Sequence, residues 1–277
     1  MSDFLELEIF SSISQELLDL SEYIKSNSNV QIEISGPATL SGIIGLAFIE
    51  SSLIERGYRY YRTFHETLDS GNDFLCIKVG EMLKKFEPMT VNLHMGHENS
   101  ERTGVLDTVA QIGALALNLC PSGKTMKLEP WLIAGSWLRT TLDMVYNPIY
   151  TSIRDYLRSA GIISVVCIPE ISNIDNIPVS EINIELLSEA RNKWADLELK
   201  SKSKFMDELV TPLLVSGKMS VQRIEELFWN RIIVNGWKLD LASQCSMANR
   251  ELSGSENVNL SASRMLDELI ASGTLIH

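Results

Sequence analysis

The segment from Val30 to Phe64 constrains the fold more than any other part of the chain. Its sequence begins with alternating apolar and polar residues, which predict a strand that stops at Ser35-Gly36-Pro37. A mostly apolar helix is predicted from Leu40 to Arg56, and Gly57 after it is a typical helix C-cap. The aromatic-rich stretch from Tyr58 to Phe64 predicts a second strand. Strand, helix and strand in this order indicate a βαβ unit, in which the two strands are parallel.

Strands and helices are predicted to alternate along the first two-thirds of the chain. Further strands are predicted at Asp73–Val79, Met89–Leu93 and Ile162–Ile168, and helices at Phe4–Ser26, Glu81–Phe86, Thr103–Leu119, Leu128–Leu142, Asn147–Ala160 and Ile182–Leu199. The remainder, from Phe205 to His277, is predicted to be mainly helical. This order indicates an α/β fold with a parallel β-sheet flanked by helices, followed by a smaller helix-rich C-terminal region.

The sequence divides most naturally into an α/β domain at residues 1–200 and a helix-rich region at residues 201–277. The run from Lys200 to Lys204 (KSKSK) near this boundary is either a hinge or a solvated turn of helix. The N-terminus is acidic and lacks the basic region of a signal peptide. Because no apolar run reaches the roughly 20 residues that span a bilayer, we expect a cytoplasmic protein without a membrane segment.

Charge and cysteine content exclude several classes of function. The formal net charge of −12 argues against a protein that binds nucleic acid on its own, since phosphate binding needs a basic surface. It does not exclude contact with DNA inside a complex. The four cysteines are widely spaced and form no CxxC pair, so we expect buried reduced thiols rather than a zinc site or disulfides.

Several short motifs fail closer tests. The segment PSGKT at Pro121–Thr125 ends like a P-loop, but Asn118 stands where that motif needs its first glycine. The residues His94, His97 and Glu98 offer two imidazoles and a carboxylate, yet no further acid cluster supports them as metal ligands, and a solvated loop is favoured.

Two nucleic-acid signals are also weak. The aromatic string from Tyr58 to Tyr61 could stack on bases, although packing within a strand explains it as well. The region from Lys218 to Gly273 resembles a winged helix in outline, but its helices carry about as many acids as bases.

In an α/β fold the loop at the carboxyl end of the first strand is the usual place for chemistry. Here that loop, Ser35 to Thr39, contains no acid, no base and no phosphate-binding glycine pattern. The lack of catalytic groups in this loop is one of several such absences along the chain, at segments that follow it in the sequence.

The order of these segments resembles the DHH phosphoesterase family, and within it the RecJ-like branch. The first family motif, roughly D-x-D-G-x-(S/T)-(S/A)-G, matches Ser35–Gly42, where Ser41 and Gly42 remain and both aspartates are replaced by Ser35 and Pro37. The second motif, an aspartate and then a glycine at the end of a strand, matches Ile77–Gly80, with Lys78 at the aspartate.

The later motifs are retained to different degrees. In the third motif, Asp-His-His, only His94 remains, between Leu93 and Met95. The fourth is similar to I-G-A-I-A-D and matches Ile112–Leu117, with Leu117 at the aspartate. Leu241–Arg250 is similar to a segment in the second domain of archaeal RecJ-like proteins, and the glycine- and histidine-rich signature that ends that domain is absent, which suggests a truncated or remodelled second domain.

The resemblance implies a pseudoenzyme. Two-metal phosphoester hydrolysis needs several carboxylates, and the matching positions here carry Ser35, Pro37, Lys78 and Leu117 instead. It therefore implies no catalytic residues, no metal ligands and no cofactor. Family members without metals act as scaffolds in DNA replication, so the implied partners are the GINS complex and possibly the MCM helicase.

Two alternatives stay open: a divergent metal-dependent phosphoesterase or nuclease that uses His94, His97 and Glu98, and an unrelated α/β adaptor or regulatory protein. The resemblance makes one structural prediction. Ser35–Pro37, Lys78, Leu93, Met95 and Leu117 should meet at the carboxyl edge of a parallel sheet, with no metal between them.

Overall fold

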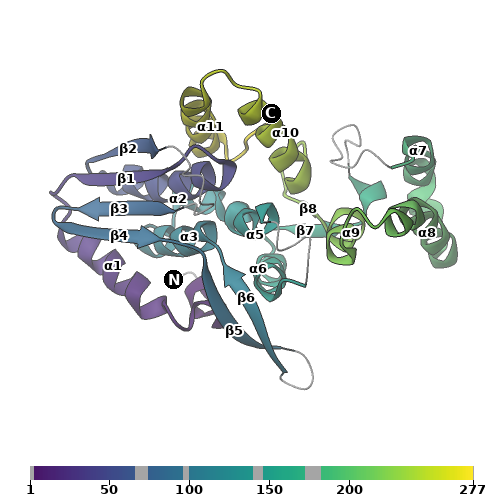
Figure 1. Ribbon diagram of the computed structural model, residues 1–277, viewed down its shortest axis with the longest axis horizontal. Helices are drawn as coiled ribbons and strands as arrows, with labels where there is room; N and C mark the ends of the chain where they lie inside the picture. Colours follow the sequence, from purple (N-terminus) through teal and green to yellow (C-terminus); the bar gives the residue numbers. More distant parts are fainter. Residues whose placement is uncertain (1–2, 66–73, 96–99, 140–145, 172–181, 277) are drawn as a thin grey trace.

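The computed structural model describes residues 3–65, 74–95, 100–139, 146–171 and 182–276 of the chain. Within these ranges the protein is a mixed α/β protein with one four-stranded sheet and two small two-stranded sheets (Figure 1). The strands are β1 (Ile32–Pro37), β2 (Tyr60–His65), β3 (Leu75–Val79), β4 (Met82–Phe86), β5 (Met89–Met95), β6 (Ser100–Leu106), β7 (Ser164–Val166) and β8 (Arg231–Ile233). The α-helices are α1 (Ser14–Ser26), α2 (Leu40–Arg56), α3 (Thr108–Leu119), α4 (Gly123–Lys127), α5 (Ala134–Leu138), α6 (Pro148–Ser159), α7 (Ile184–Lys193), α8 (Leu199–Ser216), α9 (Val221–Phe228), α10 (Leu241–Ser253) and α11 (Val258–Ser272). Short 3-10 helices lie at Asp3–Glu6, Glu8–Phe10, Glu129–Ile133, Ile168–Glu170 and Trp194–Asp196.

The predicted βαβ unit is present. Strands β1 and β2 pair in parallel, with Ile32 opposite Tyr60, and α2 connects them with the bounds that the sequence predicts. The Thr39 side chain accepts a hydrogen bond from the Gly42 amide at the start of α2, and Gly57 ends the helix with a φ of 70°. Local sequence signals, a side-chain cap and a left-handed glycine, therefore define this unit.

The sheet as a whole is not parallel, which corrects the sequence prediction. Its order is β2-β1-β3-β4, and both β1–β3 and β3–β4 pair antiparallel. The predicted helix at Glu81–Phe86 is wrong, because these residues form β4. Gly80, with a φ of 61°, and Glu81 make the two-residue turn of a β3–β4 hairpin, so the chain returns at once instead of crossing over.

Strands β5 and β6 form a second antiparallel hairpin outside the four-stranded sheet. The sequence prediction placed β5 correctly but missed β6, whose last four residues it assigned to the following helix. Residues 96–99 of the predicted polar loop lie outside the described residues. The hairpin starts close to the sheet and extends away from it (Figure 1).

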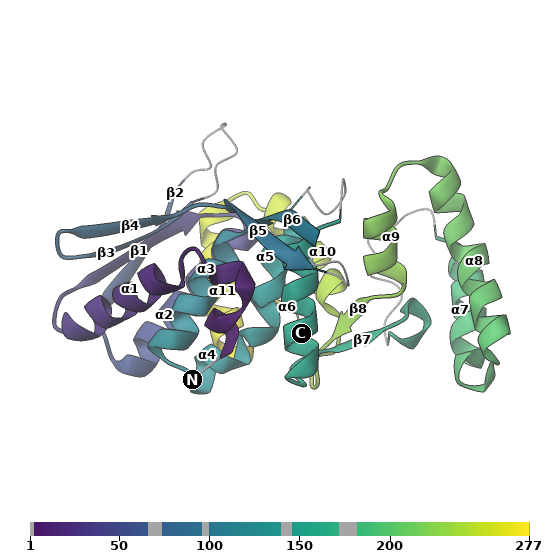
Figure 2. The same cartoon turned by 90° about the horizontal axis from the view of Figure 1, so that it is seen from below.

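The hydrophobic core lies on one side of the four-stranded sheet. Helices α1, α2 and α3 lie on that side, while the other side carries no described helix (Figure 2). Helix α2 is almost fully buried between the sheet and its neighbours α3 and α11. The face of the central strands β1 and β3 on that side is accordingly apolar, with Ile32, Ile34, Ile77 and Val79 each at most 1% exposed.

Helices α10 and α11 return to the sheet and pack on α2. Arg62 of β2 reaches α11, where it pairs with Asp267 at 2.8 Å, and it also pairs with the buried Glu50 of α2 at 2.9 Å. The Trp131 ring donates a hydrogen bond to the Gly273 carbonyl at 2.9 Å. The last described residues are thus attached to the same core as the first strands.

The residues from α7 to α9, Ile184–Phe228, extend away from the rest of the molecule, and we refer to them as the arm (Figures 1 and 2). The Lys200–Lys204 run lies inside α8 and is a solvated turn of helix, so the hinge alternative is wrong. The division predicted at residue 200 falls in the first turn of this helix. None of the helices in the described ranges is long and apolar enough to cross a bilayer.

Candidate functional site at the junction of the arm

The first loop, where the sequence placed its key substitutions, is filled by the protein's own apolar side chains. A methyl group added to Gly36 would lie 2.3 Å from the Leu75 side chain and 3.2 Å from that of Leu46. One added to Gly42 would lie 2.1 Å from the carbonyl oxygen of Pro37. The loop is therefore closely packed at the carboxyl end of β1.

The positions that were predicted to converge are separated. Lys78 lies opposite Glu33, toward the amino end of β1, with 3.6 Å between its Nζ and the Glu33 carboxylate. Leu117 is 1% exposed and belongs to α3, on the helix-covered side of the sheet, whereas Lys78 points to the open side. The prediction is wrong because β3 runs antiparallel to β1, so that its carboxyl end lies at the opposite edge.

His94 is positioned by a different contact. Its amide donates to the Glu8 carboxylate at 3.0 Å, and its Nδ1 lies 3.1 Å from the same Oε1 atom. These hydrogen bonds lower the pKa of Glu8. His97 and Glu98 lie outside the described residues. Across the ranges that the structure describes, no three His, Cys, Asp or Glu side chains lie together in a way that could hold a metal ion.

The PSGKT segment forms the short helix α4, and a carboxylate of the protein occupies its amino end. Glu55 of α2 accepts hydrogen bonds from the Lys124 amide and, at 3.2 Å, from the Thr125 hydroxyl. A phosphate group would need the same donors. This contact agrees with the rejection of a P-loop and gives the segment a structural role in joining α2 to α4.

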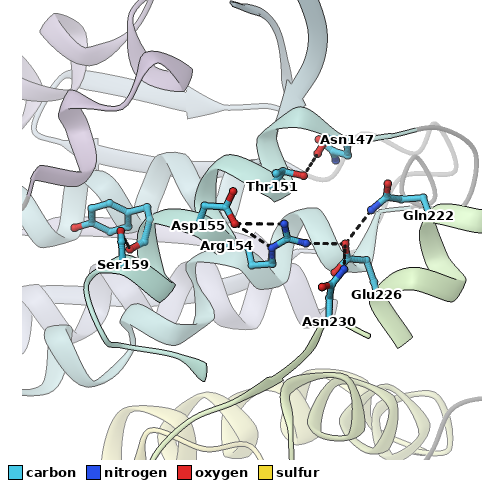
Figure 3. Close-up of polar contacts among 9 residues, drawn as sticks. Asn147, Thr151, Arg154, Asp155, Ser159, Gln222, Glu226 and Asn230 are labelled. Carbon is cyan, nitrogen blue, oxygen red and sulfur yellow. Dashed lines mark hydrogen bonds and ion pairs between the residues drawn. The ribbon is translucent and has the colours of Figure 1, made fainter. Parts of the chain in front are cut away.

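The most densely connected polar cluster in the described residues lies where the arm meets the body of the protein (Figure 3). At its centre is Glu226 of α9, whose side chain is completely buried. Its Oε1 atom accepts hydrogen bonds from Arg154 at 3.1 Å, Gln222 at 2.9 Å and Asn230 at 3.3 Å. Arg154 comes from α6, so this ion pair connects the arm to the body.

Burial is the main cause of the raised pKa of Glu226. Removal from water raises its pKa to about 7, although the positive charge of Arg154 acts in the opposite direction. The nearby Tyr150 hydroxyl also acts against the rise. The negative charge of Glu226 in turn helps raise the pKa of the buried Tyr150 hydroxyl, after the larger effect of burial. The cluster can therefore hold or release a proton near neutral pH.

A second contact attaches α9 one turn before Glu226. The Arg223 guanidinium lies over the Trp137 ring, with 4.4 Å to the ring centre, and donates to the Trp137 carbonyl at 3.1 Å. A cavity of about 360 Å³ adjoins this pair. Its wall includes Cys245, Ser246 and Asn249 of α10, which belong to the Leu241–Arg250 segment that the sequence singled out. Helices α5, α9 and α10 therefore enclose one site.

The sequence prediction missed Arg154, Glu226 and Arg223. One signal was present: Glu226 stands between Ile224 and Leu227-Phe228 on the apolar side of an amphipathic helix, where a charged residue needs a buried partner. The partner itself, Arg154, is 72 residues away in the chain, and no local pattern indicates it.

The chain has no match among models of known protein families, and no curated protein matches it. The class of the protein is therefore described by its fold alone: a mixed α/β protein from which a helical arm, Ile184–Phe228, projects.

Proposed function

We propose that this chain is a scaffold protein that binds other proteins through its arm and has no catalytic activity of its own. The observation that carries the proposal is the arm itself, which extends from the α/β body (Figure 2). It exposes apolar side chains. Val215 is 81% exposed, Val221 61% and Leu214 50%, all within eight residues around the turn from α8 to α9. Exposed apolar residues that are adjacent on a projecting element are typical of a protein interface.

The arm also has a groove between its two longer helices. A cavity of about 360 Å³ lies there, with Leu186, Leu197 and Phe205 among its lining residues. Its charged residues belong to two ion pairs, Lys193 with Glu189 and Lys204 with Glu208. An apolar floor with charges of both signs at its rim suits an amphipathic helix of a partner protein.

The partner that we propose is the GINS complex, with the MCM helicase as a further candidate, acting in the cytoplasm. This choice rests on the resemblance to RecJ-like proteins, in which four motifs occur in the family order. The absence of catalysis rests on the residues at the metal-ligand positions, above all Lys78. The mixed sheet departs from the parallel sheet of that family and favours the wider class, an α/β adaptor. The scaffold role through the arm is common to both.

Binding of purified GINS to the immobilised chain tests the proposal. Val215→Asp and Val221→Asp should each weaken binding roughly tenfold or more, since a charge would be buried in an apolar contact. Leu260→Asp is the matched control, because Leu260 is similarly exposed, at 67%, but lies on α11 outside the arm. No binding by the unchanged chain would contradict the choice of partner.

A nuclease assay separates the scaffold from the enzyme alternative. The chain is incubated with single-stranded DNA and Mn²⁺, beside a variant in which His94 and His97 are both changed to Ala. We expect no cleavage by either chain. Cleavage that the double variant abolishes would contradict the proposed absence of catalysis.

A further inference from the structure

One side of the four-stranded sheet is left open by every described element (Figure 2). The side chains on it alternate with the buried ones along each strand, as the pleat of a sheet requires. They form two rows across the strands. The first row is Tyr61, Glu33, Lys78 and Leu83, and the second is Thr63, Ser35, Cys76 and Lys85.

The first row has an ion pair at its centre and a larger exposed side chain at each end. Its two ends are apolar and exposed, with Tyr61 at 42% and Leu83 at 63%. Its centre is the ion pair of Glu33 and Lys78, whose side chains are 30% and 51% exposed. Glu33 also accepts a hydrogen bond from the Tyr61 hydroxyl, which raises the pKa of Tyr61. An acid and a base thus stand side by side on β1 and β3, between two apolar groups.

We propose that this open face binds the same face of a second copy of the chain, in a two-fold symmetric dimer. A two-fold axis parallel to the strands, between β1 and β3, brings each β1 opposite the partner's β3 and each β2 opposite the partner's β4. Under that rotation Glu33 meets Lys78 of the partner subunit, and Tyr61 meets Leu83 of the partner subunit. Both pairings occur twice, and each joins complementary groups.

This self-complementarity favours a second copy over a nucleic acid or a charged partner. Glu33 and Lys78 cancel each other, so the centre of the face has no net charge to attract a phosphate backbone. The face measures roughly 19 by 17 Å, from four strands about 4.8 Å apart and about five residues along each. This is roughly 320 Å² per copy, below the roughly 800 Å² per partner of a standard specific interface, so the dimer should be weak and depend on concentration.

Charge reversal gives a test that separates contacts between copies from those within one copy. In Glu33→Lys, a lysine would face Lys78 of the partner subunit, and in Lys78→Glu, a glutamate would face Glu33 of the partner subunit. Each variant alone should therefore be monomeric, with a dissociation constant at least tenfold weaker than that of the unchanged chain. A mixture of the two variants should form a mixed dimer, because every central pair between copies is then attractive.

Sedimentation velocity over a range of roughly 1 to 300 µM measures these states. Thermal melts of each variant show that it is folded. The matched control reverses the pair on α1, as Glu22→Lys and Lys25→Glu, which should leave the dimer unchanged. Leu83→Glu should also give a monomer. A monomeric unchanged chain, or variants that are monomeric alone and when mixed, would overturn the proposal. The face lies apart from the arm, so this result is independent of the proposed function.

Discussion

Arg154 and Glu226 lie 3.1 Å apart across the contact between α6 and α9, and the Glu226 side chain has no exposed surface. Arg154 also pairs with Asp155 beside it, at 3.3 Å, and is 16% exposed. The anion is thus the more deeply buried member of the pair. Because a buried carboxylate depends on its cation, the cost of the Glu226 charge at the base of the arm is limited mainly by Arg154.

The raised pKa of Glu226 predicts that the protein becomes less stable as pH rises. The folded chain has a pKa of about 7 for this group, against 4.5 for the unfolded chain, so between these values only the folded state keeps the proton. The free energy of unfolding should be highest below pH 4.5 and should fall as pH rises toward 7, by up to roughly 3 kcal/mol. Urea unfolding at pH 5 and pH 8 measures this difference.

Two variants isolate the contribution of Glu226 from that of other buried acids, such as Glu50, whose pKa burial also raises. Glu226→Gln carries no charge at any pH, so it should match the unchanged chain at pH 5 and exceed its stability at pH 8. Glu256→Gln, at an exposed position outside the cluster, should keep the full pH dependence. The interpretation fails if Glu226→Gln and the unchanged chain lose the same stability between the two pH values.

Removing the Arg154 cation should destabilise the protein more at high pH than at low pH, because Glu226 is charged only at high pH. In Arg154→Met the carboxylate stays buried without a partner cation, and we expect a loss of about 3–5 kcal/mol at pH 8. At pH 5 the carboxyl group is protonated and the loss should be much smaller. Limited proteolysis checks the location of the effect, since cleavage should appear first in the arm. Equal losses at both pH values would show that Arg154 acts through packing alone.

The parts of the fold that the sequence predicted correctly are those with local signals. Helix α2 begins at a threonine cap and ends at Gly57, and both signals lie within the helix or next to it. The direction of β4 has no comparable signal, because an apolar stretch before Gly80 fits a crossover and a hairpin equally well. This turn accounts for the wrong helix at Glu81–Phe86. The antiparallel pairing of β3 with β1 joins strands far apart in the chain, and no local pattern indicates it.

The functional site was harder to predict than the fold. Lys78 was correctly expected on a strand, but the partner that gives it a role, Glu33, follows from the antiparallel pairing. Arg154 and Glu226 become neighbours only through the packing of α9 on the body. A buried charge in an amphipathic helix indicates that a partner exists, and the three-dimensional structure is needed to identify it.

The close packing of the first loop predicts a specific sensitivity at Gly42. A methyl group there would lie 2.1 Å from the Pro37 carbonyl oxygen and 2.9 Å from its Cγ, so the backbone must move. We expect Gly42→Ala to lower the free energy of unfolding by about 2 kcal/mol or more. Gly254→Ala is the control, because Gly254 has a φ of −86° and its nearest contact would be 3.3 Å. Similar values for the two variants would contradict the close packing of the loop.

The buried ion pair of Arg231 and Asp240 predicts a large loss of stability when one charge is removed alone. Both side chains are at most 1% exposed and lie 2.7 Å apart, and Arg231 also donates to Ser243 at 3.2 Å. The Nε and Nη1 atoms of Arg231 have no hydrogen-bond partner among the described residues, so Asp240 supplies most of the compensation for its charge. Asp240→Ala should therefore cost about 3–5 kcal/mol, because a buried guanidinium loses its counterion.

Replacing both members of the pair should cost less than replacing one. In the double variant Arg231→Met with Asp240→Leu no charge remains in the core, and two apolar side chains of similar length fill the space. Urea unfolding of Arg231→Met, Asp240→Leu and the double variant gives the coupling energy directly. If the double variant loses as much stability as the two single variants together, the charges do not depend on each other. We expect the double variant to be more stable than Asp240→Ala.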